Sequence, residues 1–131
     1  MKINEDFLLK PKYTDYVESQ GNTNNWKWRK WHSGFCEIVA YKQHENITVT
    51  TSSAGTYYND STGRKTLQLP FHLTHEYGLT VFETPSHSSS LYVYNCYVAA
   101  DGNNLVTDFR SHGSSTNAVC AVWYYITGAW K

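Results

Sequence analysis

The chain has 131 residues, a length that suits one domain with a proper core and leaves little room for a second. Its formal net charge is zero and charged residues make up only 17% of it. This balance argues against nucleic acid as the main partner, because phosphate binding needs a basic surplus. The first twelve residues lack the apolar stretch of a signal peptide, and no apolar run approaches membrane-spanning length, so we expect no membrane insertion.

The predicted elements are all β-strands. Residues 1–14 are polar and show no period, so we expect a leader or linker ahead of one domain over 15–131. From Trp26 onward, short apolar runs alternate with clusters of Gly, Asn, Ser and Pro, and no stretch has a convincing helical period. Strands are predicted at 25–31, 35–43, 46–51, 66–74, 78–84, 90–99, 104–110 and 117–127. Their even spacing is typical of an antiparallel sandwich or barrel.

The first predicted hairpin mixes tryptophans with basic residues. Its sequence, N-W-K-W-R-K-W-H-S-G-F, contains Trp26, Trp28 and Trp31 interleaved with Lys27, Arg29 and Lys30. A three-residue loop ending at Gly34 would set Arg29 opposite Glu37 as a cross-strand ion pair, whereas a two-residue turn would pair Lys30 with Glu37. Aromatic residues on both faces indicate that the second face is either a ligand platform or a contact with another chain.

The last predicted strand carries no charge from Asn117 to Trp130. Alternation places Trp123 and Tyr125 on one face and Tyr124 and Ile126 on the other. Such a strand is either central in two packed layers or part of a subunit contact. Two such strands in one small domain favour an oligomer.

The residues that could carry catalysis or bind a metal form no recognisable pattern. Carboxylates are sparse, and the motifs of serine hydrolases, zinc proteases and phosphate loops are missing from the sequence, so we expect no enzyme activity and no cofactor. His72 and His75 would point to opposite faces of a strand, so solvated histidines are favoured over a metal site shared between neighbouring chains. The three cysteines show no zinc spacing and cannot all pair, which favours buried free thiols made in a reducing cytoplasm.

Three segments offer the side chains that a sugar site needs, namely flat aromatic faces and planar polar groups. The aromatic fraction of 16% is high, and it includes eleven tyrosines. The candidates are Tyr57, Tyr58, Asp60 and Arg64, then Tyr92 and Tyr94 beside Asn95, and finally Asp108, Arg110 and His112. On a strand, the last three would project in one line. A solvated face with an ion pair explains those three equally well, and packing explains Tyr57 and Tyr58 equally well.

Several short motifs resemble a family of phage proteins. They are Asp15-Tyr16-Val17-Glu18, Gln20-Gly21, Trp26 to Trp31, Ser33-Gly34, Glu37, Leu69-Pro70-Phe71 and the ending Tyr125 to Lys131. Together they resemble the opening, middle and end of a carboxy-terminal domain common in phage and prophage tail proteins. That family is similar to the H-type lectins, which are trimeric β-sandwiches that bind sugars.

The resemblance implies an antiparallel β-sandwich and a homotrimer in the distal tail fibre or baseplate of a virion, synthesised in the bacterial host cytoplasm. The implied function is non-catalytic recognition of host cell-surface carbohydrate, and the alternative is a structural trimer cap without a ligand. The motif is expected to be architectural, so we assign its residues to the scaffold and subunit contact, together with Trp123 of the last strand. The motif residues are Trp26, Trp28, Arg29, Trp31, Glu37 and Trp130. Binding is expected in the segments that match nothing, 52–65 and 86–117.

Overall fold

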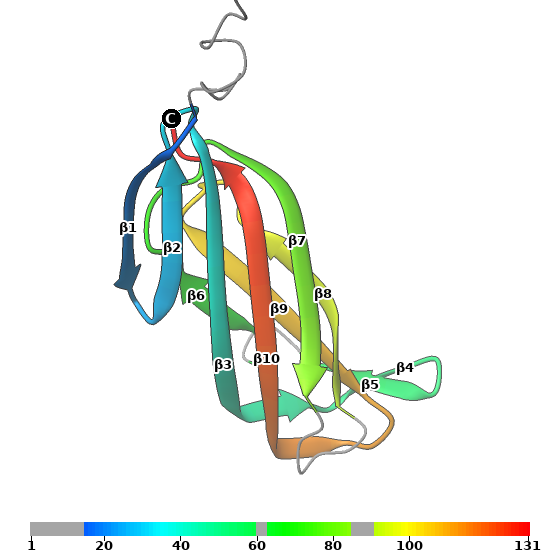
Figure 1. Cartoon of the computed structure of the whole chain (residues 1–131). Helices are drawn as coiled ribbons and strands as arrows, with labels where there is room; N and C mark the ends of the chain where they lie inside the picture. The colour runs from blue at the N-terminus through cyan, green and yellow to red at the C-terminus, as the bar shows by residue number, and fades with distance from the viewer. Residues whose placement is uncertain (1–14, 60–62, 85–90) are drawn as a thin grey trace, which may run out of the picture.

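A computed structural model describes residues 15–59, 63–84 and 91–131, and the predicted leader and Asp60 lie outside these ranges. All regular structure in the described residues is β-strand (Figure 1). The strands are β1 (Val17–Thr23), β2 (Trp26–Trp31), β3 (Phe35–Val49), β4 (Thr51–Ser53), β5 (Thr56–Tyr58), β6 (Lys65–Gln68), β7 (His75–Thr84), β8 (Tyr92–Val98), β9 (Asn104–Ser111) and β10 (Ser115–Ala129). The predicted all-β fold is confirmed.

The strands form two antiparallel sheets packed face to face (Figure 1). Sheet A has the order β1-β2-β3-β10-β7. Sheet B has the order β4-β5-β9-β6, and β8 pairs with the other edge of β9. Two layers of antiparallel sheet are the architecture of a β-sandwich, with one face of each sheet on the core and the other facing out.

The first hairpin has the predicted register. Arg29 pairs with Glu37 across β2 and β3, and their side chains form an ion pair with an Nη1–Oε1 distance of 3.8 Å. Gly34 adopts a φ of 98°, and its amide donates to the Trp31 carbonyl at 3.0 Å. Glycine suits this position because other residues rarely adopt a left-handed backbone. The three-residue loop is therefore confirmed over the two-residue turn.

The strands predicted at 35–43 and 46–51 are mainly one long strand, β3, which carries a bulge. Ala118 of β10 pairs with Ile47 and Cys120 pairs with His44, so β3 contains one extra residue between these two pairs. Asn46 lies there with a φ of 55°. Before the bulge the buried side chains of β3 are those of even-numbered residues, and after it they are those of odd-numbered residues. In the sequence, this break in the alternation resembles the end of a strand.

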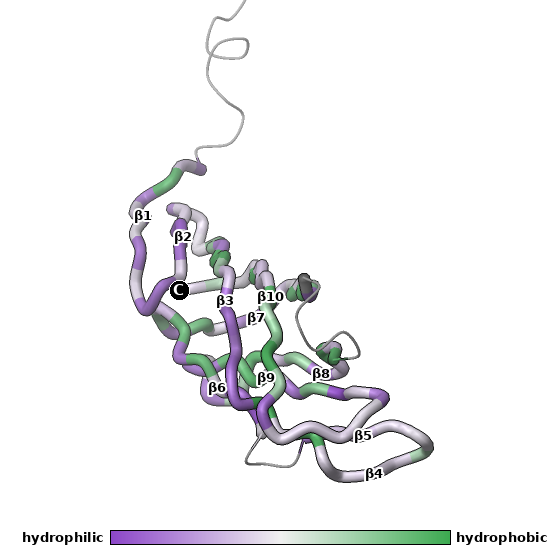
Figure 2. The backbone as a smooth tube through the Cα atoms, turned by 90° about the horizontal axis from the view of Figure 1, so that it is seen from below, coloured by the Kyte–Doolittle hydropathy of each residue, from purple (hydrophilic) through white to green (hydrophobic). Residues whose placement is uncertain are grey.

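Three other boundaries differ from the prediction. β1 was missed because all seven of its residues are exposed, which leaves no apolar alternation to detect. The strand expected at 66–74 ends at Gln68, since Pro70 cannot donate a backbone hydrogen bond. The segment 52–65 was expected to be a loop but contains most of the β4–β5 hairpin, which projects beyond the sheets in Figures 1 and 2.

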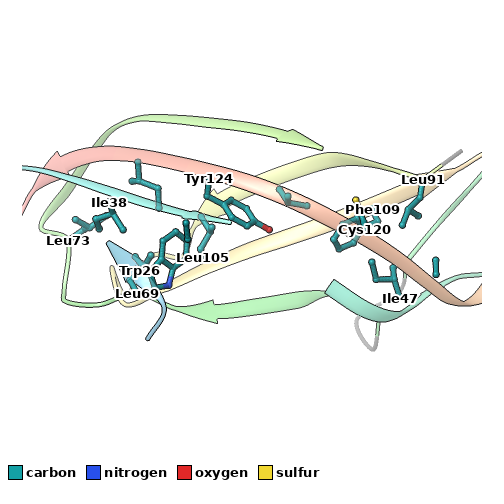
Figure 3. Packing of buried hydrophobic residues seen from close by; sticks show 14 of the residues in the cluster. Trp26, Ile38, Ile47, Leu69, Leu73, Leu91, Leu105, Phe109, Cys120 and Tyr124 are labelled. Atoms are coloured by element: carbon teal, nitrogen blue, oxygen red, sulfur yellow. The ribbon is translucent and has the colours of Figure 1, made fainter. Parts of the chain in front are cut away.

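The core fills the space between the two sheets. Figure 3 shows Tyr124 between one group that includes Trp26 and Leu105 and another that includes Phe109 and Cys120. The Tyr124 hydroxyl lies 2.8 Å from Nε2 of His44 and 2.8 Å from Oγ1 of Thr107. These groups come from β10, β3 and β9, so one buried hydroxyl joins the two sheets.

The cysteines are all free. Cys36 and Cys120 are buried in the core, as predicted, whereas Cys96 is half-buried. Burial raises the pKa of each thiol to about 11, which keeps all three protonated near neutral pH.

Candidate functional site

The outer face of sheet B collects many of the side chains expected to bind a ligand. Leu105 and Phe109 of β9 point into the core, and alternation sends Asp108 and Arg110 to the opposite face. β8 runs along one side of β9, while β5 and β6 pair with its other side. We call the following residues the sheet B cluster: Tyr58, Asn59, Arg64, Tyr94, Asn95, Asp108 and Arg110.

Asp108 is the anchor of this cluster and is only 1% exposed. Arg64 donates to both carboxylate oxygens, from Nε at 2.9 Å and from Nη2 at 3.0 Å. Asn59 and Asn95 donate their side-chain amides at 2.9 and 3.3 Å. Burial alone would raise the pKa of Asp108, but the hydrogen bonds from Arg64 and Asn59 outweigh it and hold the pKa below its ordinary value. The carboxylate therefore stays ionised.

This arrangement changes the role expected for Asp108. A carboxylate that is buried and bonded to three neighbours is not open to a sugar hydroxyl. The predicted line of Asp108, Arg110 and His112 thus includes one residue that positions others instead of contacting a ligand. Its bidentate pair with Arg64 fixes the orientation of that guanidinium, whose side chain remains 41% exposed.

Arg110 lies beside Asp108 on the same face, between two tyrosines. Its guanidinium carbon is 4.6 Å from the ring centroid of Tyr94 and 5.9 Å from that of Tyr58. Tyr94 is 40% exposed, and burial is the largest of the effects that raise its pKa. Cation–π contacts of this kind orient an arginine without neutralising its charge.

Of the other predicted ligand residues that the structure describes, Tyr92 and His112 lie beside the cluster and Tyr57 does not. Tyr92 pairs with Arg110 across β8 and β9, and its ring centroid lies 6.3 Å from that of the exposed His112. Tyr57 is half-buried and packs against the core.

A groove lies beside the cluster, where the edge strands of the two sheets face each other. It has a volume of about 500 Å³. One wall is Glu76, Gly78, Leu79 and Val81 of β7, and the other is Val93 to Tyr97 of β8. The groove shares Tyr94 and Asn95 with the cluster. It therefore extends the cluster with partly apolar walls.

The outer face of sheet A has a different character. Tyr41, Trp123 and Phe82 are direct cross-strand neighbours on β3, β10 and β7. The ring centroid of Trp123 lies 4.9 Å from that of Tyr41 and 6.4 Å from that of Phe82. Each of the three is at least 40% exposed. We call them the aromatic row. Alternation along β10 predicted from the sequence that Trp123 lies on this face. The positions of Tyr41 and Phe82 beside it follow only from the register in which β3 and β7 pair with β10.

A second hollow, of about 630 Å³, lies beyond this row toward β1. Lys27, Arg29 and Glu37 line it, together with Tyr125 and Gln20 to Asn22. The Tyr125 hydroxyl donates to Oε2 of Glu37 at 2.8 Å, which adds to the Arg29 ion pair. The charged side chains of this hollow therefore bind largely to one another.

The tryptophans of the first hairpin are parts of the scaffold. Trp26 is fully buried, and its Nε1 donates to the Gln68 carbonyl at 3.0 Å, which ties β2 to β6. Trp130 donates to the Trp31 carbonyl at 3.0 Å and so fixes the end of the chain. The ammonium of Lys30 lies 4.8 Å from the Trp130 ring. The mixture of aromatic and basic residues that suggested a ligand platform is thus used largely within the chain.

No family model, curated protein or solved structure matches the chain. The resemblance to phage tail domains therefore rests on the sequence motifs alone. Within the described residues, no helix is long and apolar enough to span a bilayer, and no three His, Cys, Asp or Glu side chains group as a metal site would require.

Proposed function

We propose that the chain is a non-catalytic receptor-binding domain that recognises host cell-surface carbohydrate at the distal end of a phage tail fibre or baseplate. The observation that carries this proposal is the sheet B cluster beside its groove. It combines the exposed Tyr94 and the half-buried Tyr58 with arginine and asparagine side chains, which suit the apolar faces and the hydroxyls of sugar rings respectively.

The proposed assembly is a homotrimer that associates through the outer face of sheet A. Two observations support association there. The aromatic row leaves three large apolar rings together on an open sheet face. β1 buries none of its seven residues, so besides its backbone pairing with β2 it is held by exposed contacts such as the Lys131–Glu18 ion pair, and a second chain could cover it. The number of copies comes from the resemblance to trimeric phage domains.

The two faces make these roles compatible. The outer faces of the two sheets lie on opposite sides of the sandwich, so association through sheet A leaves the cluster on sheet B open. Several copies of a weak sugar site then act together, which raises the overall affinity without new contacts.

The second candidate function is a structural cap that joins the chains of a fibre and binds nothing. The aromatic row favours it, because association requires only that face. A glycan array with bacterial surface sugars separates the two candidates. We expect selective binding by the wild type, loss of binding in Tyr94→Ala, and retention in Tyr16→Ala, which removes an exposed tyrosine next to β1 of sheet A. Silence of the wild type across the array would favour the cap.

Light scattering tests the association. We expect a mass about three times that of the 15.1 kDa chain at micromolar concentration. Trp123→Ser should lower this mass, whereas Tyr97→Ser should not, because Tyr97 has similar exposure but belongs to sheet B. A monomeric wild type at that concentration would contradict the proposed trimer.

A further inference from the structure

The charges of the sheet B cluster do not cancel. Asp108 carries the negative charge, and Arg64 neutralises it through two hydrogen bonds. Arg110 adds a second positive charge. Within the described residues no carboxylate lies within ion-pair distance of Arg110 and no hydrogen bond reaches its guanidinium, so the cluster holds one excess positive charge.

The Nε atom of Arg110 is a second sign that this positive charge lacks a partner within the described residues. This nitrogen is buried, and it has no hydrogen-bond partner among the residues that the structure describes. A buried donor without an acceptor costs free energy, and it leaves the guanidinium charge without a compensating hydrogen bond within the described residues. Since Nε itself is enclosed, an ionised acceptor would contact the rest of the half-buried Arg110 side chain. The rings of Tyr94 and Tyr58 flank the guanidinium, so its position is set before a ligand arrives.

From this geometry we infer that the carbohydrate recognised by the cluster is acidic, with its carboxylate or phosphate bound by Arg110. A planar guanidinium fork matches either group with two parallel hydrogen bonds, which a neutral hydroxyl cannot reproduce. The anionic group lies at Arg110, and the neutral part of the saccharide extends along the groove past Tyr94. This inference rests on the proposed function, since it names the chemical class of the ligand at that same site.

The test compares three ligands by isothermal titration: a uronic-acid trisaccharide, its carboxyl-reduced neutral counterpart, and a hexose phosphate. The wild-type chain should bind an acidic ligand about tenfold more tightly than the neutral counterpart, the change expected from one charge-assisted contact. The preference should shrink as salt is added, because the contact is only partly buried. Tighter binding of the uronic acid or of the phosphate identifies which anion the site takes.

Variants of Arg110 test whether this residue causes the preference for the acidic saccharide. Arg110→Gln should bind the acidic and neutral saccharides equally, and Arg110→Lys should keep part of the preference because it retains the charge without the fork. Arg29→Gln removes a surface arginine from sheet A and should leave the preference unchanged. Thermal unfolding of each variant shows that it is folded. The ligand comparison on the wild type needs no variant and stands even if Arg110→Gln does not fold.

Two results would overturn the inference and leave the proposed function intact. One is equal binding of the acidic and neutral saccharides by the wild type, and the other is a preference that survives in folded Arg110→Gln. If the wild type binds none of the saccharides, including those of the glycan array, the proposed function itself is wrong.

Discussion

The hydroxyl of Tyr124 is the most informative single group to remove. Tyr124 is 1% exposed, and its hydroxyl bonds to both His44 and Thr107 at 2.8 Å. Tyr124→Phe deletes one oxygen and leaves the ring in place, so two buried polar groups lose their partner at once. Each such loss costs about 1–3 kcal/mol. We therefore expect Tyr124→Phe to lower the free energy of unfolding by about 2–6 kcal/mol.

The neighbouring residue supplies a matched control. Tyr125 is 41% exposed, and its hydroxyl donates to the half-buried Glu37 at 2.8 Å. Water replaces this bond when the hydroxyl is removed, so Tyr125→Phe should cost less than about 1 kcal/mol. The two variants make the same chemical change at adjacent positions and differ in burial and in the partners that the hydroxyl loses.

Urea unfolding at one protein concentration, followed by tryptophan fluorescence, measures both variants against the wild type. The midpoint of Tyr124→Phe should fall well below that of Tyr125→Phe, with an unchanged dependence on urea. Combining Tyr124→Phe with Thr107→Val should cost less than the sum of the two single changes, because both partners of one bond are then apolar. Equal midpoints for Tyr124→Phe and Tyr125→Phe would refute the argument that the buried hydroxyl joins the sheets.

Two other variants test the core and a turn. Burial, reinforced by the charges of Lys65 and Lys42, lowers the pKa of His44 to about 4 from an ordinary 6.5, so the unfolded chain binds a proton that the folded chain does not. The free energy of unfolding should fall by about 3 kcal/mol between pH 6.5 and 4, and His44→Gln should flatten this dependence in urea titrations at each pH. Ala54 holds a φ of 49° in the two-residue turn between β4 and β5. Ala54→Asn should therefore raise the free energy of unfolding by up to about 1 kcal/mol, whereas a lower free energy of unfolding would mean that the turn is not strained.

The parts of the fold that could be predicted are those whose signal is local. The register of the first hairpin followed from Gly34 and the loop length, and the two faces of β10 followed from strict alternation. The turn between β4 and β5 gave no signal, because its first position holds Ala54 where asparagine, aspartate or glycine is usual. β1 gave no sequence signal because all seven of its residues are exposed in the single chain, so no apolar alternation marks it.

The candidate site was predicted in part for the same reason. Alternation placed Asp108 and Arg110 on one face of a strand, since both lie on β9. The partners that define their roles are distant: Arg64 is 44 residues before Asp108, and Asn59 is 49 residues before it. Only the pairing of β9 with β5 and β6 brings them together. Burial of Asp108 under these partners is a tertiary property, and local sequence could not distinguish it from an exposed acceptor.

The outer faces of the two sheets differ in a way that suits different partners. The aromatic row is held by packing alone, and large apolar rings gain most when they are covered by another protein surface. In the sheet B cluster, the carboxylate of Asp108 instead holds Arg64, Asn59 and Asn95 in one geometry. Polar groups fixed in advance lose little conformational entropy when a ligand binds, which matters most for a small, flexible and strongly hydrated ligand such as a sugar. A sandwich that placed these polar groups on sheet A would lose them to association. Their separation onto opposite faces is the feature that would let one short chain both assemble and bind.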